Sequence, residues 1–207
     1  MRLAESSIHH YHLPYDRPVH WFNSSEAGAN FVLLRLVGDD GSVGVGEATI
    51  KPTWSGTSVR SVVAVLEDLL LPALQATDIT DAAAVSQSMG RFPENTLAKT
   101  LIANACHTLR SAATGKPAWQ LAGGSRSVDL SWCVTRQAPP AMAAEAARMV
   151  DRFGFRALKV KGGQGIDTDL RALREITKAV GTDVAFYVDT NAAYPLDPSG
   201  DYIRAIA

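Results

Sequence analysis

The sequence has few of the residues that build the most easily recognised sites. Only two of its 207 residues are cysteines, Cys106 and Cys133, and their separation does not match the short spacing of zinc ligands. Two isolated cysteines give no disulfide framework either. Both side chains are therefore expected to be buried thiols, and neither a zinc protein nor a disulfide-stapled domain is indicated.

Long apolar runs and an excess of charge are also missing. No stretch approaches the roughly 18 apolar residues of a membrane-spanning helix, and residues 1–5 lack the long apolar core of a signal peptide. The 20 basic and 21 acidic side chains give a net charge of -1. This balance favours neither nucleic acid nor a membrane surface as a partner, and the cytoplasm is the expected location.

What the sequence does contain is a strand–helix–strand pattern near its end. Residues 156–161 and 184–189 have the composition of β-strands, and residues 167–180 carry apolar side chains three or four positions apart, as in an amphipathic helix. The two strands of such a βαβ unit are parallel. Side chains that follow them should therefore meet at the carboxyl ends, where barrels and open α/β sheets place their chemistry.

Polar side chains occur at both of these strand ends. Lys159 and Lys161 are two residues apart and share one face of the first strand. Asp189 and Asn191 have the same spacing, and we expect them to project together if the strand geometry persists. Neighbouring ammonium groups repel each other, which lowers the pKa of both lysines towards the range of a catalytic base. The alternative is that the lysines lie on a solvated edge strand and protect it against edge-to-edge pairing.

These residues resemble a known family. The segments 159–163 and 188–194 are similar to the corresponding segments of the mandelate racemase and muconate lactonizing enzymes of the enolase superfamily. Four further segments resemble that family in the same order along the chain: 12–18, 45–48, 115–124 and 130–135. The resemblance therefore covers the whole chain. Gly162 departs from the family's pattern, because Val or Ile usually follows the second lysine.

The resemblance implies a role for each polar residue at the two strand ends. Lys161 would be the base that removes a proton from the carbon next to a carboxylate, and Lys159 would contact that carboxylate and keep the pKa of Lys161 low. Asp189 would be the first of three carboxylate ligands of Mg²⁺, and Asn191 would lie beside it near the substrate. A hard dication held by oxygen ligands can stabilise the enediolate that forms when the proton leaves.

The resemblance also implies the fold. Residues 1–126 would form an α+β capping domain with a three-stranded meander plus helices. Residues 127–207 would form an incomplete (β/α) TIM-type barrel with about three of its eight βα units. The expected elements beyond the βαβ unit are strands at 2–13, 30–38, 43–50 and 128–135 and helices at 94–114, 139–153 and 198–207.

Two loops of the capping domain are expected to close over the mouth of the barrel. By the resemblance these are residues 19–25 and 49–55, which contain Trp21 and Trp54. Trp54 is a candidate substrate-binding residue, although packing explains an aromatic side chain at these positions equally well.

The implied function is Mg²⁺-dependent abstraction of a proton α to the carboxylate of a small substrate, as in the muconate cycloisomerase subgroup of cycloisomerases and epimerases. A mandelate racemase-like racemase or an acid-sugar dehydratase is the alternative. Because a barrel alone needs about 250 residues, the 207-residue chain is expected to be a fragment. The alternative to an enzyme is that the chain is a truncated, catalytically inactive module for binding or assembly. A homo-oligomer is a further expectation from the family.

Overall fold

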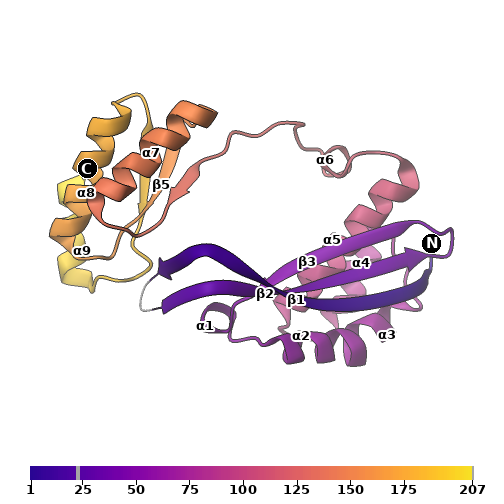
Figure 1. Cartoon of the computed structure of the whole chain (residues 1–207). Coiled ribbons are helices and arrows are strands. Elements are labelled where there is room, and N and C mark those ends of the chain that lie inside the picture. The colour runs from indigo at the N-terminus through magenta and orange to yellow at the C-terminus, as the bar shows by residue number, and fades with distance from the viewer. Residues whose placement is uncertain (22–23, 207) are drawn as a thin grey trace. The chain divides into compact units, whose positions relative to one another are not determined.

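The computed structural model describes residues 1–21 and 24–206, in two compact units (Figure 1). Unit 1 consists of residues 1–14 and 28–127, and unit 2 of residues 15–27 and 128–207. The division after residue 127 lies next to the expected domain boundary after residue 126, but residues 15–27 group with unit 2. In the expected loop 19–25, residues 22 and 23 and the side chain of Trp21 lie outside the described part of the chain.

Unit 1 is built on a sheet with the strand order β1-β2-β3. The strands are β1 (Leu3–Trp21), β2 (Ser24–Gly38) and β3 (Val43–Ile50), and β2 pairs antiparallel with β3. The first two strands extend well beyond the predicted segments 2–13 and 30–38. A backbone hydrogen-bond ladder can continue through polar residues, so side-chain composition does not mark where these strands end.

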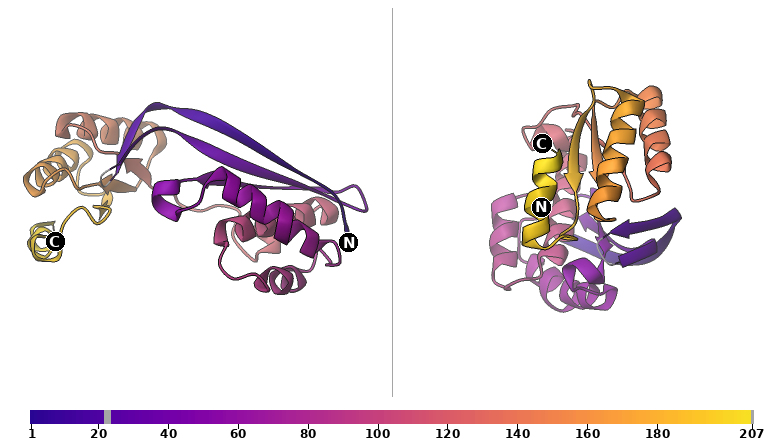
Figure 2. Two further views of the ribbon diagram at one scale, coloured as in Figure 1. Left: turned by 90° about the horizontal axis from the view of Figure 1, so that it is seen from below. Right: turned by 90° about the vertical axis from the view of Figure 1, so that its left-hand side faces the viewer.

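The helices of unit 1 lie on one side of this sheet (Figure 2, left). Buried leucines of β2, including Leu34 and Leu36, pack in one core with Leu101, Ile102 and Leu109 of the longest helix. The helical elements are α1 (Pro52–Ser55), α2 (Val59–Val65), the single-turn π-helix η1 (Leu66–Leu70), α3 (Leu71–Leu74), α4 (Ala82–Gly90), α5 (Thr96–Thr114) and α6 (Ala118–Leu121). No helix in the described part of the chain is long and apolar enough to cross a membrane.

Two glycines allow α5 to lie directly on β3. Gly44 and Gly46 are on the buried face of that strand. A Cβ atom added at Gly44 would overlap the backbone oxygen of Ala105, and one added at Gly46 would overlap that of Leu101. Glycine is therefore required here for close approach of a helix to a strand, not for an unusual backbone angle.

Unit 2 contains a parallel sheet with the strand order β4-β5-β6. Its strands are β4 (Trp132–Val134), β5 (Ala157–Lys161) and β6 (Ala185–Asp189), and its helices are α7 (Pro139–Phe153), α8 (Ile166–Val180) and α9 (Leu196–Ile206). The predicted βαβ unit is thus present. Because β5 pairs with a strand on each side, the interpretation of Lys159 and Lys161 as protection of an edge strand is wrong.

Helices α7 and α8 cover one face of this sheet (Figure 2, right). Leu158 and Val160 of β5 point into a core with Met142 of α7 and Ile176 of α8. The alternation of side chains along β5 therefore leaves its two lysines on the opposite face.

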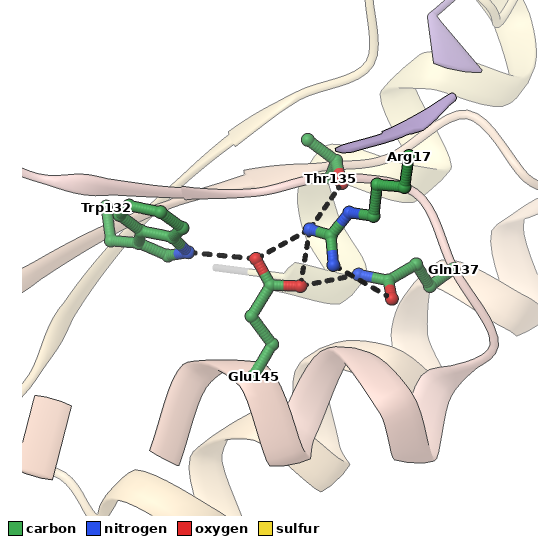
Figure 3. Close-up of polar contacts among 5 residues, drawn as sticks. All are labelled: Arg17, Trp132, Thr135, Gln137 and Glu145. Carbon is green, nitrogen blue, oxygen red and sulfur yellow. Dashed lines mark hydrogen bonds and ion pairs between the residues drawn. The ribbon is translucent and has the colours of Figure 1, made fainter. Parts of the chain in front are cut away.

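A buried carboxylate holds Arg17 of β1 against β4 and α7 within unit 2 (Figure 3). Glu145 is 3% exposed and accepts hydrogen bonds from Arg17, Trp132 and Gln137 at 2.6–3.0 Å. Burial raises the pKa of the Glu145 carboxyl, but these hydrogen bonds outweigh it, so the net shift of its pKa is downward. Arg17 also donates to Thr135, which directly follows β4.

Candidate active site

The two lysines of β5 lie in register with the polar side chains of its neighbours. Lys159 is paired with Cys133 of β4 and Tyr187 of β6, and Lys161 is paired with Asp189 at the end of β6. Since side chains of paired residues project to the same face of a sheet, one face carries this group at the carboxyl end of the strands.

The four polar residues predicted at these strand ends lie in contact. Nζ of Lys161 donates to Oδ2 of Asp189 at 2.8 Å and to Oδ1 of Asn191 at 2.7 Å. Nζ of Lys159 lies 2.9 Å from the same Asp189 oxygen. The side chain of Lys161 is 14% exposed and that of Lys159 is 31% exposed, so the first is the more shielded from solvent.

The electrostatics of this group differ in part from the expectation of two mutually repelling lysines. Partial burial raises the pKa of the Asp189 carboxyl, but hydrogen bonds from Lys161 and Lys159 lower it by more, so the net shift is strongly downward. The hydrogen bond to Asp189 also raises the pKa of Lys159, whereas repulsion was expected to lower it. That expectation is wrong for Lys159 because it omitted the carboxylate that both lysines share.

Asn191 reaches Lys161 through a turn and not by continuation of the strand. β6 ends at Asp189, and Asn191 has a left-handed backbone with a φ of 51°. Its N–H donates to Oδ1 of Asp189 at 3.0 Å. Asparagine tolerates this conformation better than most residues. The predicted proximity is therefore present, but the assumption that the strand geometry persists to residue 191 is wrong.

The sequence analysis missed two side chains that hold the segments around the lysines. Arg136, which follows β4, donates from Nε to the backbone oxygen of Gly162 and from Nη2 to that of Thr190. Asp169 accepts from the N–H groups of Gly163 and Gln164 at 2.6 and 3.1 Å. An acidic residue in the first turn of a predicted helix is a signal for such capping, but no pattern marks the position of Arg136.

The Asp169 contacts explain the glycine that departs from the family's pattern. A Cβ atom at Gly162 would lie 2.7 Å from Oδ2 of Asp169. A larger residue at this position would therefore displace the carboxylate that holds the loop after β5.

Cys133, which is paired with Lys159 across the sheet, carries a thiol that is a candidate nucleophile. Burial raises the pKa of its thiol, although Lys161 and Lys159 act in the opposite direction. The thiolate is the reactive form of cysteine, so this environment does not favour nucleophilic chemistry.

The donor atoms at the end of β6 fit part of a site for a hard cation. Asp189 offers carboxylate oxygens and Asn191 an amide oxygen, the ligand types that Mg²⁺ prefers. Within residues 1–21 and 24–206 there is no group of three or more His, Cys, Asp or Glu side chains that could hold a metal ion. Asp189 and Asn191 alone would therefore supply only some of the oxygen ligands that a bound Mg²⁺ ion requires.

Comparison with known proteins gives two matches that together span most of the chain. Residues 4–123 match the N-terminal domain of mandelate racemase / muconate lactonizing enzyme, and residues 141–207 match the enolase C-terminal domain-like family. The chain belongs to the mandelate racemase / muconate lactonizing enzyme family. The resemblance seen in the sequence is thus confirmed.

Relatives in this family are about twice as long. An L-Ala-D/L-Glu epimerase from Clostridium acetobutylicum is 26% identical over 94% of this chain and 54% of its own length. A muconate lactonizing enzyme from Pseudomonas fluorescens, complexed with muconolactone, superposes with a TM-score of 0.91 at 26% identity, over 99% of this chain and 57% of that structure. A dipeptide epimerase from Enterococcus faecalis, complexed with Mg and the dipeptide L-Leu-L-Tyr, shows the same fold with a TM-score of 0.91 at 22% identity, over 100% of this chain and 58% of that structure. The chain spans about half the length of the curated relatives it matches.

Trp54 is in unit 1, whereas the residues at the strand ends are in unit 2. It belongs to α1 of unit 1, and its side chain is 70% exposed. Its expected contact with a substrate stays a prediction.

Proposed function

We propose that this chain is part of a Mg²⁺-dependent enzyme that removes a proton α to the carboxylate of a small substrate, with a reaction like those of cycloisomerases and epimerases. The observation that carries the proposal is the contact of Lys161 with Asp189 and Asn191 at the carboxyl ends of two parallel strands. The family's epimerases and muconate lactonizing enzymes support the reaction class.

In the proposed mechanism Lys161 takes the α-proton on Nζ. Its low exposure keeps water away from the ammonium group that forms, and Asn191 offers an oxygen that orients it. The ammonium group of Lys159, on the same face of the sheet, would bind the carboxylate of the substrate. Asp189 would ligate Mg²⁺, which when bound supplies positive charge that stabilises the enediolate oxygens. Trp54 would contribute to substrate binding from α1.

The rest of the site would come from a longer protein. We propose that residues 1–126 are a capping domain and that residues 127–207 are the first three βα units of a (β/α)₈ barrel. The parallel sheet with α7 and α8 on one face supports this assignment, because the opposite face would then line the barrel interior. Further carboxylate ligands and a base on the other side of the substrate would lie on later strands.

The test uses the protein extended to the length of its relatives. With Mg²⁺ in ²H₂O, we expect deuterium to enter the α-position of an accepted dipeptide or muconolactone-type acid, and Lys161→Ala to abolish this exchange while Mg²⁺ affinity stays unchanged. Lys178→Ala, which changes a lysine in the last turn of α8, is the matched control. Proton NMR follows the exchange and also distinguishes epimerisation from loss of water. Exchange that persists in Lys161→Ala would contradict the assignment of the base.

A further inference from the structure

Arg136 is a buried charge that the proposed reaction does not use directly. It lies two residues after the end of β4 and is 7% exposed. A buried guanidinium is costly unless its N–H groups are satisfied. Nε of Arg136 donates to the backbone oxygen of Gly162 at 2.5 Å, and Nη2 donates to that of Thr190 at 3.2 Å.

These two carbonyl groups belong to residues that are next to Lys161, Asp189 and Asn191 in the sequence. Gly162 directly follows Lys161, and Thr190 lies between Asp189 and Asn191. One planar guanidinium therefore binds the carbonyl groups of two residues, of which one follows Lys161 and the other lies between Asp189 and Asn191. Because the fork of an arginine is rigid, it constrains how far apart the two carbonyls, and hence the two strand ends, can lie.

The loop after β5 is held from its other side by Asp169. This carboxylate accepts from the N–H groups of Gly163 and Gln164 and from the hydroxyl of Tyr194. The Tyr194 oxygen in turn accepts from the N–H of Gly165 at 3.1 Å. Hydrogen bonds to Arg136, Asp169 and Tyr194 thus hold every residue of the segment 162–165.

Gly163 makes room for the guanidinium. Its φ is +97°, and a Cβ atom at this position would overlap Nη2 of Arg136. Backbone conformation and clearance both require glycine here. The two glycines after Lys161 are therefore matched to the two charged side chains that bind the loop.

We propose that Arg136 is a positioning residue that sets the separation between Nζ of Lys161 and the oxygens of Asp189 and Asn191. The catalytic importance of that separation rests on the function proposed above, but the separation itself can be measured without any activity. Lysine cannot replace Arg136 in this role, because an ammonium group has no planar fork to bind two carbonyls in a defined geometry.

The first experiment uses the 207-residue chain and compares Arg136→Lys and Arg136→Gln with the unsubstituted protein. Two amides report on the strand ends: the N–H of Gly162 donates to the backbone oxygen of Asp189, and the N–H of Asn191 donates to its carboxylate. We expect hydrogen exchange at both amides, followed by NMR, to accelerate about 10-fold or more beyond the change in global stability, as loss of hydrogen bonds to a charged group would produce.

Ile176→Ala is the control for a purely structural effect. Ile176 is fully buried in the core of unit 2 on the other face of the sheet, so its truncation destabilises the same unit without touching Arg136. Urea unfolding supplies the stability of each variant. If the two amides respond no more to the Arg136 variants than to Ile176→Ala at matched stability, the proposal is overturned. Arg136→Lys keeps the charge and provides this comparison even if Arg136→Gln does not fold.

The second experiment tests the consequence in the extended protein. We expect both Arg136 variants to lower kcat for α-proton exchange about 100-fold with little change in KM, because a misplaced base slows the chemical step more than binding. Ile176→Ala should leave kcat nearly unchanged below its unfolding temperature. A rise in KM with unchanged kcat would contradict positioning of the base. An extended protein without exchange activity would instead refute the proposed function, and the amide measurements would still decide the role of Arg136.

Discussion

Two carboxylates of unit 2 show how the surroundings of a side chain decide what it can do. Asp189 is shared by two ammonium groups, and its side chain is 28% exposed. Glu145 is 3% exposed and surrounded by donors from Arg17, Trp132 and Gln137. A cation can therefore compete with the two lysines for Asp189, whereas Glu145 holds Arg17 of β1 within unit 2.

Glu145→Gln should change the stability of the protein in a pH-dependent way. Folding lowers the pKa of this carboxyl, so its contribution is fully present above the unfolded pKa of about 4.3 and is lost as pH falls through the lower folded value. We expect the variant to be about 1.5–3 kcal/mol less stable near pH 7, because hydrogen bonds to a charged group are lost. The difference from the unsubstituted chain should shrink on acidification.

Urea unfolding between neutral and acidic pH measures this difference. Glu175→Gln is the control, because Glu175 forms an ion pair with Arg171, whose side chain is largely exposed, and such pairs contribute little to stability. If the difference in free energy of unfolding between Glu145→Gln and the unsubstituted chain does not change with pH, the ionised carboxylate of Glu145 is not what stabilises its contacts with Arg17, Trp132 and Gln137.

At the scale of elements, the contact between β3 and α5 leaves no room for side chains at Gly44 and Gly46. Gly44 and Gly46 by themselves lower the stability of this strand, because glycine has no side chain to pack and loses much conformational entropy. In the structure the same two glycines allow a helix to lie against the strand without any intervening side chain. A residue that weakens an element by itself thus permits the packing that stabilises it.

Gly46→Ala should therefore lower the free energy of unfolding by about 1–3 kcal/mol, because the new methyl group overlaps the backbone oxygen of Leu101. Gly90→Ala is the matched control. A Cβ atom at Gly90, the last residue of α4, meets nothing within 4 Å, and alanine favours a helix by up to about 1 kcal/mol. Chemical denaturation of both variants measures the effect. Equal stability of the two would contradict the close approach of α5 to β3.

At the scale of the whole molecule, the described residues offer few of the oxygen ligands that a Mg²⁺ site needs. Asp189 supplies one carboxylate, and the described residues contain no cluster of three potential ligands. This agrees with a chain that covers about half the length of its relatives.

The 207-residue chain should consequently bind Mg²⁺ with a dissociation constant of about 1 mM or weaker, since one carboxylate supplies too few oxygen ligands. Isothermal titration calorimetry measures this constant, and Asp189→Asn should weaken the binding further. A micromolar constant that survives in Asp189→Asn would place the metal elsewhere in the chain.

The predicted bounds of some helices and strands agree with the structure, and those of others do not. The predicted helix 139–153 and strand 43–50 coincide with α7 and β3. The predicted strand 128–135 is reduced to Trp132–Val134, because Val128 and Leu130 are 80% and 69% exposed and do not join the sheet. Apolar residues in a connecting segment are indistinguishable from strand residues by pattern alone.

The positions of most helices and strands, and the meeting of Lys161 with Asp189, could be derived from the sequence. Both depend on the alternation of side chains along a strand and on the parallel arrangement of a βαβ unit, which are properties of short segments. The carbonyl partners of Arg136 and the turn that brings Asn191 to Lys161 could not be derived in this way. They depend on distances between segments far apart in the chain, and packing alone sets those distances.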